Sequence, residues 1–227
     1  MDNNDLLDIP PFLDRLTQEE CGACVVTASN WKPHVYFAGK IDQNDWRHGI
    51  VPGLRNVLYE EGPLDAGPYI YNGPYFVSCD HGCHHGPTTH GVLPARAWSG
   101  EPCYQPSEYA QPDSREVARR ALEGLRKSQL VFAYINALDC IGTCIEIGLA
   151  VQMRKPVAIC IDAHIDELEF WFPAEFPGVT MYTGIAESDL PRILGRELAA
   201  LQDRTEKCAN ENRVFEAIEV ILREGAP

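Results

Sequence analysis

The stretch Asp139-Cys-Ile-Gly-Thr-Cys-Ile-Glu146-Ile-Gly-Leu-Ala150 decides the fold, because a short apolar run lies on each side of it. Residues 130–135 (LVFAYI) precede it, and residues 156–161 (PVAICI) follow it. Continuous apolar runs, as opposed to alternating ones, are typical of strands that helices cover on both faces. The two runs therefore predict adjacent parallel strands, and the stretch between them predicts the helix that crosses from one to the other.

This helix places two carboxylates. Gly142 and Thr143 are predicted to open it, so Asp139 falls in the loop before the helix and Glu146 about one turn inside it. Three apolar residues at helical spacing predict its buried stripe, namely Ile145, Leu149 and Met153. Both carboxylates are then expected at the carboxyl edge of a parallel sheet, where open α/β folds bind their ligands.

The rest of the chain alternates strand and helix signals. Residues 34–39 (HVYFAG) predict the first strand, which ends in Ala38 and Gly39, two small residues that allow a ligand or a helix to approach the backbone. Residues 69–78 predict a second strand region and residues 179–183 a fifth strand. Helices are predicted at about 44–58, 114–126, 166–172, 187–207 and 213–222. This alternation predicts an α/β fold: a doubly wound, five-stranded parallel sheet, flavodoxin-like or Rossmann-like, with helices on both faces.

The composition is that of a soluble globular protein. A chain of 227 residues, 45% of them hydrophobic, can bury one core, so we expect a single domain over residues 1–227 with an irregular N-terminal cap at 1–32. The net charge of -14 argues against nucleic acid or an anionic membrane as the partner. We find no signal peptide or membrane-spanning run, and we expect a cytoplasmic protein whose nine cysteines are mostly reduced thiols.

A long loop, residues 79–112, is rich in cysteine, histidine and aromatic residues, and we expect it to fold over the site. Its histidines, His81 and His84 among them, are expected to hydrogen-bond within the loop, with one or two facing the substrate. An alternative is a zinc site formed by four cysteines: Cys21, Cys24, Cys79 and Cys83. Their spacing fits no closed structural zinc pattern, so we expect no metal and no cofactor.

Three stretches carry a family pattern: residues 35–39 (VYFAG), residues 128–135 (SQLVFAYI), and residues 139–150 with residues 155–157 (KPV) behind them. Together they resemble the nucleoside 2-deoxyribosyltransferase family and its N-glycosidase relatives. The resemblance implies that Glu146 is the nucleophile, that Asp139 works with the nucleobase, and that the hydroxyl of Tyr36 lies near the nucleophile. Gln129 stands where the family often has an aspartate, and we expect it in the substrate site.

The residue types suit cleavage of an N-glycosidic bond even without that resemblance. Such a cleavage develops positive charge on the sugar and negative charge on the departing base, so it needs an ionised carboxylate and a proton donor. We expect the helix N-terminus to keep Glu146 ionised. Asp139, if burial beside another carboxylate raises its pKa, would protonate the departing base. Trp46 and Arg47 are candidates for the sugar pocket, and the alternatives are helix packing for Trp46 and a surface ion pair for Arg47.

These features predict an enzyme that cleaves a 2′-deoxynucleoside through a covalent glycosyl ester at Glu146 and transfers the sugar to another nucleobase. Transfer is favoured over hydrolysis because the long loop could keep water away from the ester. A nucleoside or nucleotide N-glycosidase with the same residues is one alternative, and a non-catalytic nucleotide-binding or metal-sensing module is another. We expect small-molecule nucleosides and nucleobases as partners, and a homo-oligomer.

Overall fold

The structure, a computed structural model, describes residues 31–41, 45–54, 63–74 and 114–224. The chain divides into two compact units, of which one is Lys32–Arg196 and the other combines Met1–Trp31 with Glu197–Pro227. The described strands and the candidate site belong to the first unit. The single-domain interpretation stays a prediction.

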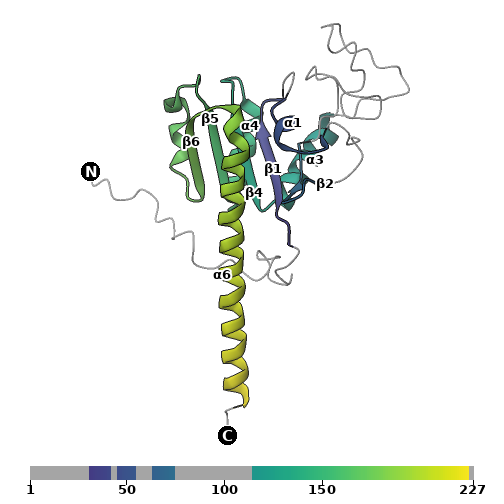
Figure 1. Cartoon of the computed structure of the whole chain (residues 1–227), viewed down its shortest axis with the longest axis vertical. Helices are drawn as coiled ribbons and strands as arrows, with labels where there is room; N and C mark the ends of the chain where they lie inside the picture. Colours follow the sequence, from purple (N-terminus) through teal and green to yellow (C-terminus); the bar gives the residue numbers. More distant parts are fainter. Residues whose placement is uncertain (1–30, 42–44, 55–62, 75–113, 225–227) are drawn as a thin grey trace, which may run out of the picture. The chain divides into compact units, whose positions relative to one another are not determined.

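The first unit is an α/β fold built on a six-stranded, mostly parallel sheet with the strand order β2-β3-β1-β4-β5-β6 (Figure 1). The strands are β1 (His34–Gly39), β2 (Leu64–Asp65), β3 (Ile70–Tyr71), β4 (Leu130–Ile135), β5 (Val157–Asp162) and β6 (Val179–Ile185). The predicted parallel sheet is confirmed, but it has one strand more than predicted. A turn with Gly67 at positive φ folds the two-residue β2 back along β3, antiparallel to it.

The carboxyl ends of β1 and β4 lie side by side in the middle of the sheet. Their pairing runs from Val35 opposite Leu130 to Gly39 opposite Tyr134, so the two strands end at the same level. The chain places β3 on one side of β1 and β4 on the other, which makes the junction of β1 and β4 the point where the strand order reverses. Open α/β sheets bind ligands outside the carboxyl ends of the strands at such a point.

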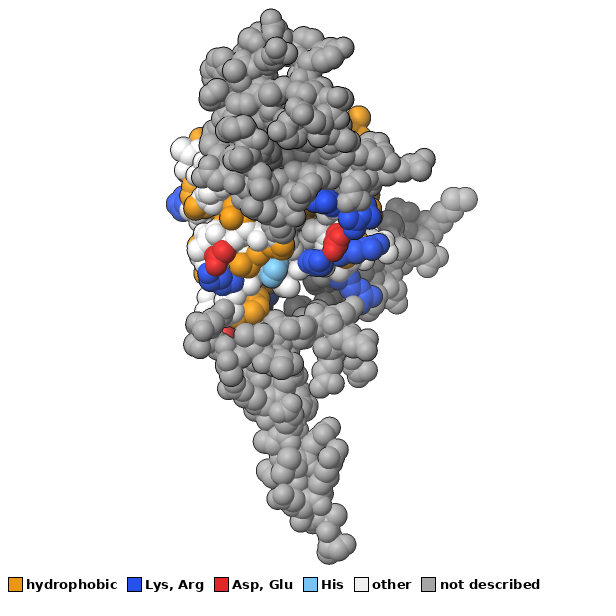
Figure 2. Space-filling model, turned by 90° about the vertical axis from the view of Figure 1, so that its right-hand side faces the viewer, with side chains coloured by type: hydrophobic (Ala, Val, Ile, Leu, Met, Phe, Trp, Pro, Cys, Tyr) orange, Lys and Arg blue, Asp and Glu red, His pale blue; other side chains and the backbone are white. Residues whose placement is uncertain are grey.

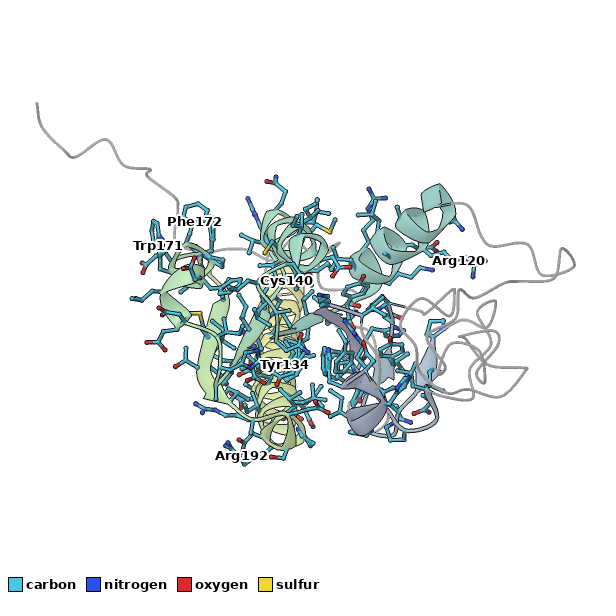
Figure 3. All side chains as sticks on the ribbon, turned by 90° about the horizontal axis from the view of Figure 1, so that it is seen from above. Arg120, Tyr134, Cys140, Trp171, Phe172 and Arg192 are labelled. Carbon is cyan, nitrogen blue, oxygen red and sulfur yellow. The ribbon has the colours of Figure 1, made fainter. Side chains whose placement is uncertain are left out.

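Helices cover both faces of the sheet, as predicted. Seen from above in Figure 3, α3 (Ser114–Lys127) and α4 (Ile141–Gln152) lie on one side of it, and α1 (Arg47–Ile50) and the first turns of α6 (Leu190–Glu224) lie on the other. Three short helical segments follow β5 and β6: η2 (Glu167–Phe170), α5 (Trp171–Ala174) and η3 (Glu187–Asp189).

The two faces of the sheet are packed differently. Beneath α3 and α4 the inward residues of the central strands are mostly aliphatic, and they pack with Leu125 of α3 and Ile147 of α4. On the other face Phe37 lies among four aromatic rings at centroid distances of 5.5–6.0 Å: Trp46, Tyr69, Tyr71 and Phe132. β1 is therefore buried on both faces, which is why its sequence is continuously apolar.

A glycine allows α3 to lie close to the sheet. A Cβ atom added at Gly124 would lie 2.1 Å from the carbonyl oxygen of Asn72, the residue after β3. The side-chain amide of Asn72 donates a hydrogen bond to the Gly124 carbonyl at 3.2 Å, and the Ser128 hydroxyl donates to the same carbonyl at 2.8 Å. Because β4 begins two residues after Ser128, this contact also fixes where β4 starts.

The buried face of α4 differs from the predicted one. Thr143, Ile147 and Ala150 face the sheet, whereas Ile145 is 58% exposed. Leu149 and Met153 of the predicted stripe are partly buried and pack against the core, so the prediction is wrong for Ile145 alone. Apolar residues occupy every side of this helix, so their spacing alone does not identify the inward side. Leu122 of α3 is likewise among the exposed hydrophobic residues.

Two predicted helices have other bounds in the structure. The helix predicted at about 44–58 is only the four-residue α1 within the described residues, because Pro52 follows and the residue before a proline disfavours helical geometry; Val51 is extended. The two predicted terminal helices are one, α6, since residues 208–212 (CANEN) contain neither glycine nor proline. In the described ranges no helix, α6 included, has the length and apolar character needed to cross a bilayer.

Some predictions fall on other parts of the chain. The N-terminal cap up to residue 30, the second strand region from Tyr75 onward and the loop at 79–112 lie outside the described residues.

On the described surface, Figure 2 shows Lys and Arg side chains gathered around a carboxylate. Helix α3 carries such an arrangement, in which Glu123 pairs with Arg119 at 3.0 Å and with Lys127 at 2.6 Å. Exposed pairs of this kind contribute little to stability.

Gly124→Ala should destabilise the protein by about 1–3 kcal/mol, because the new Cβ meets a backbone carbonyl that can move only if β3 moves with it. The matched control is Gly195→Ala in α6, where an added Cβ has open space and the helix propensity of alanine should stabilise by up to about 1 kcal/mol. Urea unfolding followed by circular dichroism measures both. Equal effects of the two substitutions would contradict the close contact at Gly124.

Candidate active site

A hydrogen bond between β1 and α4 forms the centre of the candidate site. The hydroxyl of Tyr36 donates to Oε1 of Glu146 at 2.5 Å. Tyr36 is fully buried and Glu146 is half-buried. The structure thus brings together the residue predicted as the nucleophile and the tyrosine predicted beside it, although 110 positions of sequence separate them.

Helical spacing explains why Glu146 faces inward. The buried residues of α4 are Thr143, Ile147 and Ala150, and Glu146 follows Thr143 by three positions, so it lies on the same side of the helix. That side packs against β1, β4 and β5. The carboxylate is therefore held toward the sheet, within reach of the long side chain of Tyr36, and not in open solvent.

The surroundings of this pair shift both pKa values. Burial raises the pKa of Glu146 above the ordinary glutamate value, and the hydrogen bond from Tyr36 and the charge of Arg47 lower it in part. Burial, together with the Glu146 carboxylate, raises the pKa of Tyr36 well above its ordinary value, so Tyr36 is a neutral donor at physiological pH. Glu146 is the sixth residue of α4, beyond the first turn, and burial outweighs the expected effect of the helix N-terminus.

Arg47, predicted for the sugar pocket or for a surface ion pair, is buried completely. Its guanidinium pairs with the carboxylate of Asp45 at 2.7 Å, and both side chains are 0% exposed. Burial alone would lower the pKa of Arg47, but Asp45 raises it above the ordinary value, so the guanidinium stays charged. The surface-pair interpretation is wrong, and in this structure Arg47 has no exposed side-chain surface to offer a sugar.

Asp139 lies in the loop before α4, as predicted, but its surroundings are not the expected ones. Its carboxylate accepts hydrogen bonds from Nζ of Lys40 at 2.6 and 2.7 Å, and its side chain is 71% exposed. The hydrogen bond from Lys40 holds the pKa of Asp139 below its ordinary value. The rise of this pKa that we considered from the sequence is wrong, because the neighbour of Asp139 is a cation and its side chain is in solvent.

A protein side chain fills the space beside the glycine turn at the end of β1. A Cβ atom at Gly39 would lie 3.0 Å from the ring of Trp46 and 3.0 Å from the carbonyl oxygen of Tyr134. Trp46 is 2% exposed, and its ring meets that of Tyr134 edge-on at a centroid distance of 5.4 Å. Ala38 is fully buried in the aliphatic core. The small residues at this turn therefore make room for packing, which agrees with the helix-packing interpretation of Trp46.

Gln129 lies at the amino ends of the parallel strands, whereas the other described candidates of the site lie toward the carboxyl ends. It precedes β4, and its Oε1 accepts a hydrogen bond from the backbone N–H of His34, the first residue of β1, at 2.7 Å. Gln129 therefore joins the amino ends of β1 and β4. The prediction that it belongs to the substrate site is not supported, because ligands of parallel sheets bind at the carboxyl ends of the strands.

The remaining predicted site residues fall into two groups. Gly142 and Thr143 lie in the first turn of α4 as predicted, Gly142 exposed and Thr143 buried. His81, His84 and the four cysteines of the alternative zinc site lie outside the described residues. Among the residues that are described, no three or more His, Cys, Asp or Glu side chains are placed so that they could hold a metal ion.

Sequence reasoning missed three polar residues near the carboxyl ends of β1 and β4. Lys40 follows β1 directly, Asn136 follows β4 directly, and Asp45 stands two positions before Arg47. A search for polar residues directly after neighbouring strands would have found the first two. Within the described part of the chain, Oδ1 of Asn136 and Nε1 of Trp46 are buried without a hydrogen-bond partner, which is uncommon for polar atoms.

Glu146→Gln should stabilise the fold at neutral pH. Because the folded-state pKa of Glu146 is raised, the native chain binds more protons than the unfolded chain between the ordinary and the raised value, so stability falls as the pH rises through that window. Glutamine keeps a hydrogen-bond acceptor for Tyr36 and has no charge, so the variant does not lose this stability as the pH rises. Thermal unfolding should give a higher Tm for the variant at neutral pH and nearly equal Tm values at about pH 4.

The control for this prediction is Glu169→Gln, a change of an exposed glutamate on η2, which should leave Tm almost unchanged at neutral pH. A Glu146→Gln protein less stable than the parent at neutral pH would contradict the cost that we assign to burying this carboxylate.

Comparison of the chain with models of protein families finds no match, and comparison with curated proteins finds no significant one. The resemblance based on three short stretches therefore remains an expectation. The function has to be argued from the described residues of the site: Tyr36, Glu146, Arg47 with Asp45, and Asp139 with Lys40.

Proposed function

We propose that the chain cleaves the N-glycosidic bond of a 2′-deoxynucleoside through attack of Glu146 on the anomeric carbon, and that the glycosyl ester passes its sugar to a second nucleobase. The observation that carries this proposal is the 2.5 Å hydrogen bond from the buried hydroxyl of Tyr36 to the half-buried Glu146 carboxylate. A neutral hydroxyl bound to one oxygen fixes the orientation of the carboxylate without neutralising its charge, which is what a nucleophile needs.

The arrangement of the strands supports a ligand at this place. With β2 set aside, the parallel strands lie in the order β3-β1-β4-β5-β6, which corresponds to 2-1-3-4-5 in chain order, the order of flavodoxin-like folds. Such folds bind their ligand beside the first and third parallel strands, here β1 and β4. Tyr36 belongs to β1, and Glu146 belongs to the helix that follows β4.

The proposed reaction has two displacements. In the first, an oxygen of Glu146 forms a bond to C1′ of the sugar while the C1′–N bond breaks, and its electron pair leaves with the base, which takes up a proton. In the second, a nitrogen of the incoming base bonds to C1′, the ester bond breaks, Glu146 leaves as a carboxylate, and the base loses a proton. Two displacements at C1′ retain its configuration.

Proton transfer falls to the pair of Lys40 and Asp139. Because Asp139 is ionised in this arrangement, it is an acceptor for an N–H group of a base and not by itself a donor. The Lys40 ammonium, bound to both carboxylate oxygens, carries the proton that a departing base needs. We therefore assign donation to Lys40 and acceptance from the incoming base to Asp139, in place of a single acid at Asp139. The proton then passes from Asp139 to the neutral Lys40 amine through their hydrogen bond, which restores the ion pair.

Hydrolysis of the same ester is the second candidate function, and one observation favours it. The side chain of Asp139 is 71% exposed, so water reaches the carboxylate that follows β4. Water that attacks C1′ of the glycosyl ester would release free deoxyribose by the same mechanism. A nucleoside or nucleotide N-glycosidase would then be the better description.

An incubation of thymidine with adenine tests the proposed function. Transfer yields thymine and deoxyadenosine, hydrolysis yields thymine and free deoxyribose, and chromatography separates the three products. We expect deoxyadenosine to exceed free sugar. A thermal shift with nucleosides but no release of thymine, in the parent chain, would contradict the proposal and favour a module that only binds.

Glu146→Gln should reduce the release of thymine by at least about 1,000-fold, because the amide cannot form the glycosyl ester, while nucleoside binding largely survives. The control is again Glu169→Gln, which should keep the parent rate. A 2-fluoro-2-deoxy nucleoside, which slows both displacements, should leave a sugar adduct on the peptide that contains Glu146. An adduct on another residue, or near-normal turnover of Glu146→Gln, would show that the nucleophile is assigned wrongly.

A further inference from the structure

The ion pair of Asp45 and Arg47 has no place in the reaction described so far. Both side chains are 0% exposed, so neither meets solvent, and a 2.7 Å contact joins them. Burying two charges costs several kcal/mol for each ion before their attraction and hydrogen bonds repay it, so apolar residues of similar volume are often at least as stable. Stability alone is therefore a weak explanation for a charged pair at this position.

Arg47 holds the carboxyl end of β1 through its backbone. Nε donates to the carbonyl of Phe37 at 2.9 Å, and Nη2 donates to the carbonyl of Gly39 at 2.6 Å, while Nη1 binds Asp45. A longer contact of 3.5 Å joins Nη1 to the carbonyl of Lys40. Only the planar guanidinium has donors spread widely enough to bind a carboxylate and successive carbonyls together, and a lysine ammonium lacks that geometry.

The carbonyls of Phe37 and Gly39 that Arg47 binds lie between two functional residues, one in β1 and one directly after it. Tyr36, the donor to Glu146, directly precedes Phe37, and Lys40, the partner of Asp139, directly follows Gly39. Arg47 itself is fixed by stacking on the ring of Trp46, with 4.6 Å from its guanidinium carbon to the ring centroid. The end of β1 that presents both pairs is thus held by one side chain.

The positive end of the ion pair is the end that acts on the candidate nucleophile. Arg47 interacts electrostatically with both Glu146 and Tyr36, whereas the charge of Asp45 acts on Glu187, beyond β6. Among the residues that the structure describes, Tyr36 from β1 and Arg47 from α1 act on Glu146, and Tyr71 from β3 interacts with both of these. The cation of the buried pair is therefore the one of its two charges that lowers the pKa of Glu146.

We propose that Arg47 is a positioning residue for the nucleophile: its fork holds the carboxyl end of β1 between Tyr36 and Lys40, and its buried charge acts on the Glu146 carboxylate without touching the substrate. Asp45 keeps the guanidinium in place and balances its charge. This inference rests on the proposed function, since it is there that Glu146 needs to be ionised, but the coupling of the two charges can be measured without turnover.

The test is a titration of Glu146 by NMR on protein with ¹³C-labelled glutamate side chains, with the signal assigned by its loss in Glu146→Gln. The double variant Asp45→Asn, Arg47→Gln removes both charges and leaves the net charge unchanged, and Arg47→Lys keeps the charge and removes the fork. Both are made in a Gly195→Ala background, because both should lose stability. We expect the titration midpoint of Glu146 to rise in the double variant and to stay at the parent value in Arg47→Lys.

A merely structural role for Arg47 would lower stability in both variants and leave the Glu146 midpoint unchanged in the double variant, which would overturn the proposal. An equal rise of the midpoint in both variants would overturn it as well, because a lost contact and not a lost charge would then be the cause. If only Arg47→Lys folds, a midpoint equal to the parent value supports the proposal, and a raised midpoint overturns it.

A kinetic measurement separates this inference from the proposed function. In the parent and in each variant that folds, the acid limb of the pH profile for thymine release should follow the NMR midpoint of Glu146. A midpoint that shifts as expected, in a parent chain that releases no thymine, would sink the proposed function and leave the charge coupling intact. Thymine release in the parent chain, with an unchanged Glu146 midpoint in the double variant, would support the proposed function and overturn the charge coupling.

Discussion

The pairing of β1 with β4 is the interaction on which the rest of the structure depends. It sets Gly39 beside Tyr134, so that the loops after the two strands begin at the same level. Lys40 and Asp139 can form an ion pair only because of this register, and α4 can carry Glu146 to Tyr36 only because the helix returns over the strand that precedes it. Each contact of the candidate site therefore follows from one parallel strand pair.

The site combines charges that the fold treats differently. Asp45 and Arg47 are fully buried and satisfy each other, Glu146 is half-buried with one neutral donor, and Asp139 stays in solvent with its cation. Burial makes electrostatic interactions stronger and less sensitive to salt, while an exposed pair is easily exchanged for another partner. The charges of Asp45 and Arg47 are thus fixed inside the protein, whereas those of Asp139 and Lys40 can change partners. This arrangement suits a site in which one carboxylate keeps its position while a nucleobase binds and leaves.

The sequence predicts the strands well because burial on both faces leaves a clear pattern. The runs at residues 34–39 and 130–135 coincide with β1 and β4, and the apolar residues there have no side on which a polar residue would be tolerated. The same argument fails for α4, whose apolar residues surround the helix, so the inward position of Glu146 had to come from the structure. Two-residue strands such as β2 leave no periodic signal at all.

For the candidate site, residue type and chain position predict the pair of Tyr36 and Glu146, but not the environment that decides its chemistry. The neighbour of Asp139 is Lys40, which follows β1. The sequence around Asp139 does not show which other loop of the chain lies beside it, so it does not predict whether the neighbour is a carboxylate or a lysine. The resemblance assigns Gln129 to the site because it stands at the position of a family aspartate. A residue that precedes a parallel strand nevertheless lies at the amino ends of the strands, away from the site. Charges and neighbours across strands depend on register, which short patterns do not contain.

The distance along the chain between β1 and β4 also affects how this protein acquires its site. Val35 pairs with Leu130, so the first strand must wait for some hundred residues of chain before its central partner exists. Contacts between distant residues are formed against a high entropic cost and slow the folding of a domain. Tyr36 and Glu146 meet only when β1 has paired with β4, so a partly synthesised or partly folded chain lacks the hydrogen bond between them. A ligand that binds only where both residues are in place selects the complete fold and stabilises it by mass action.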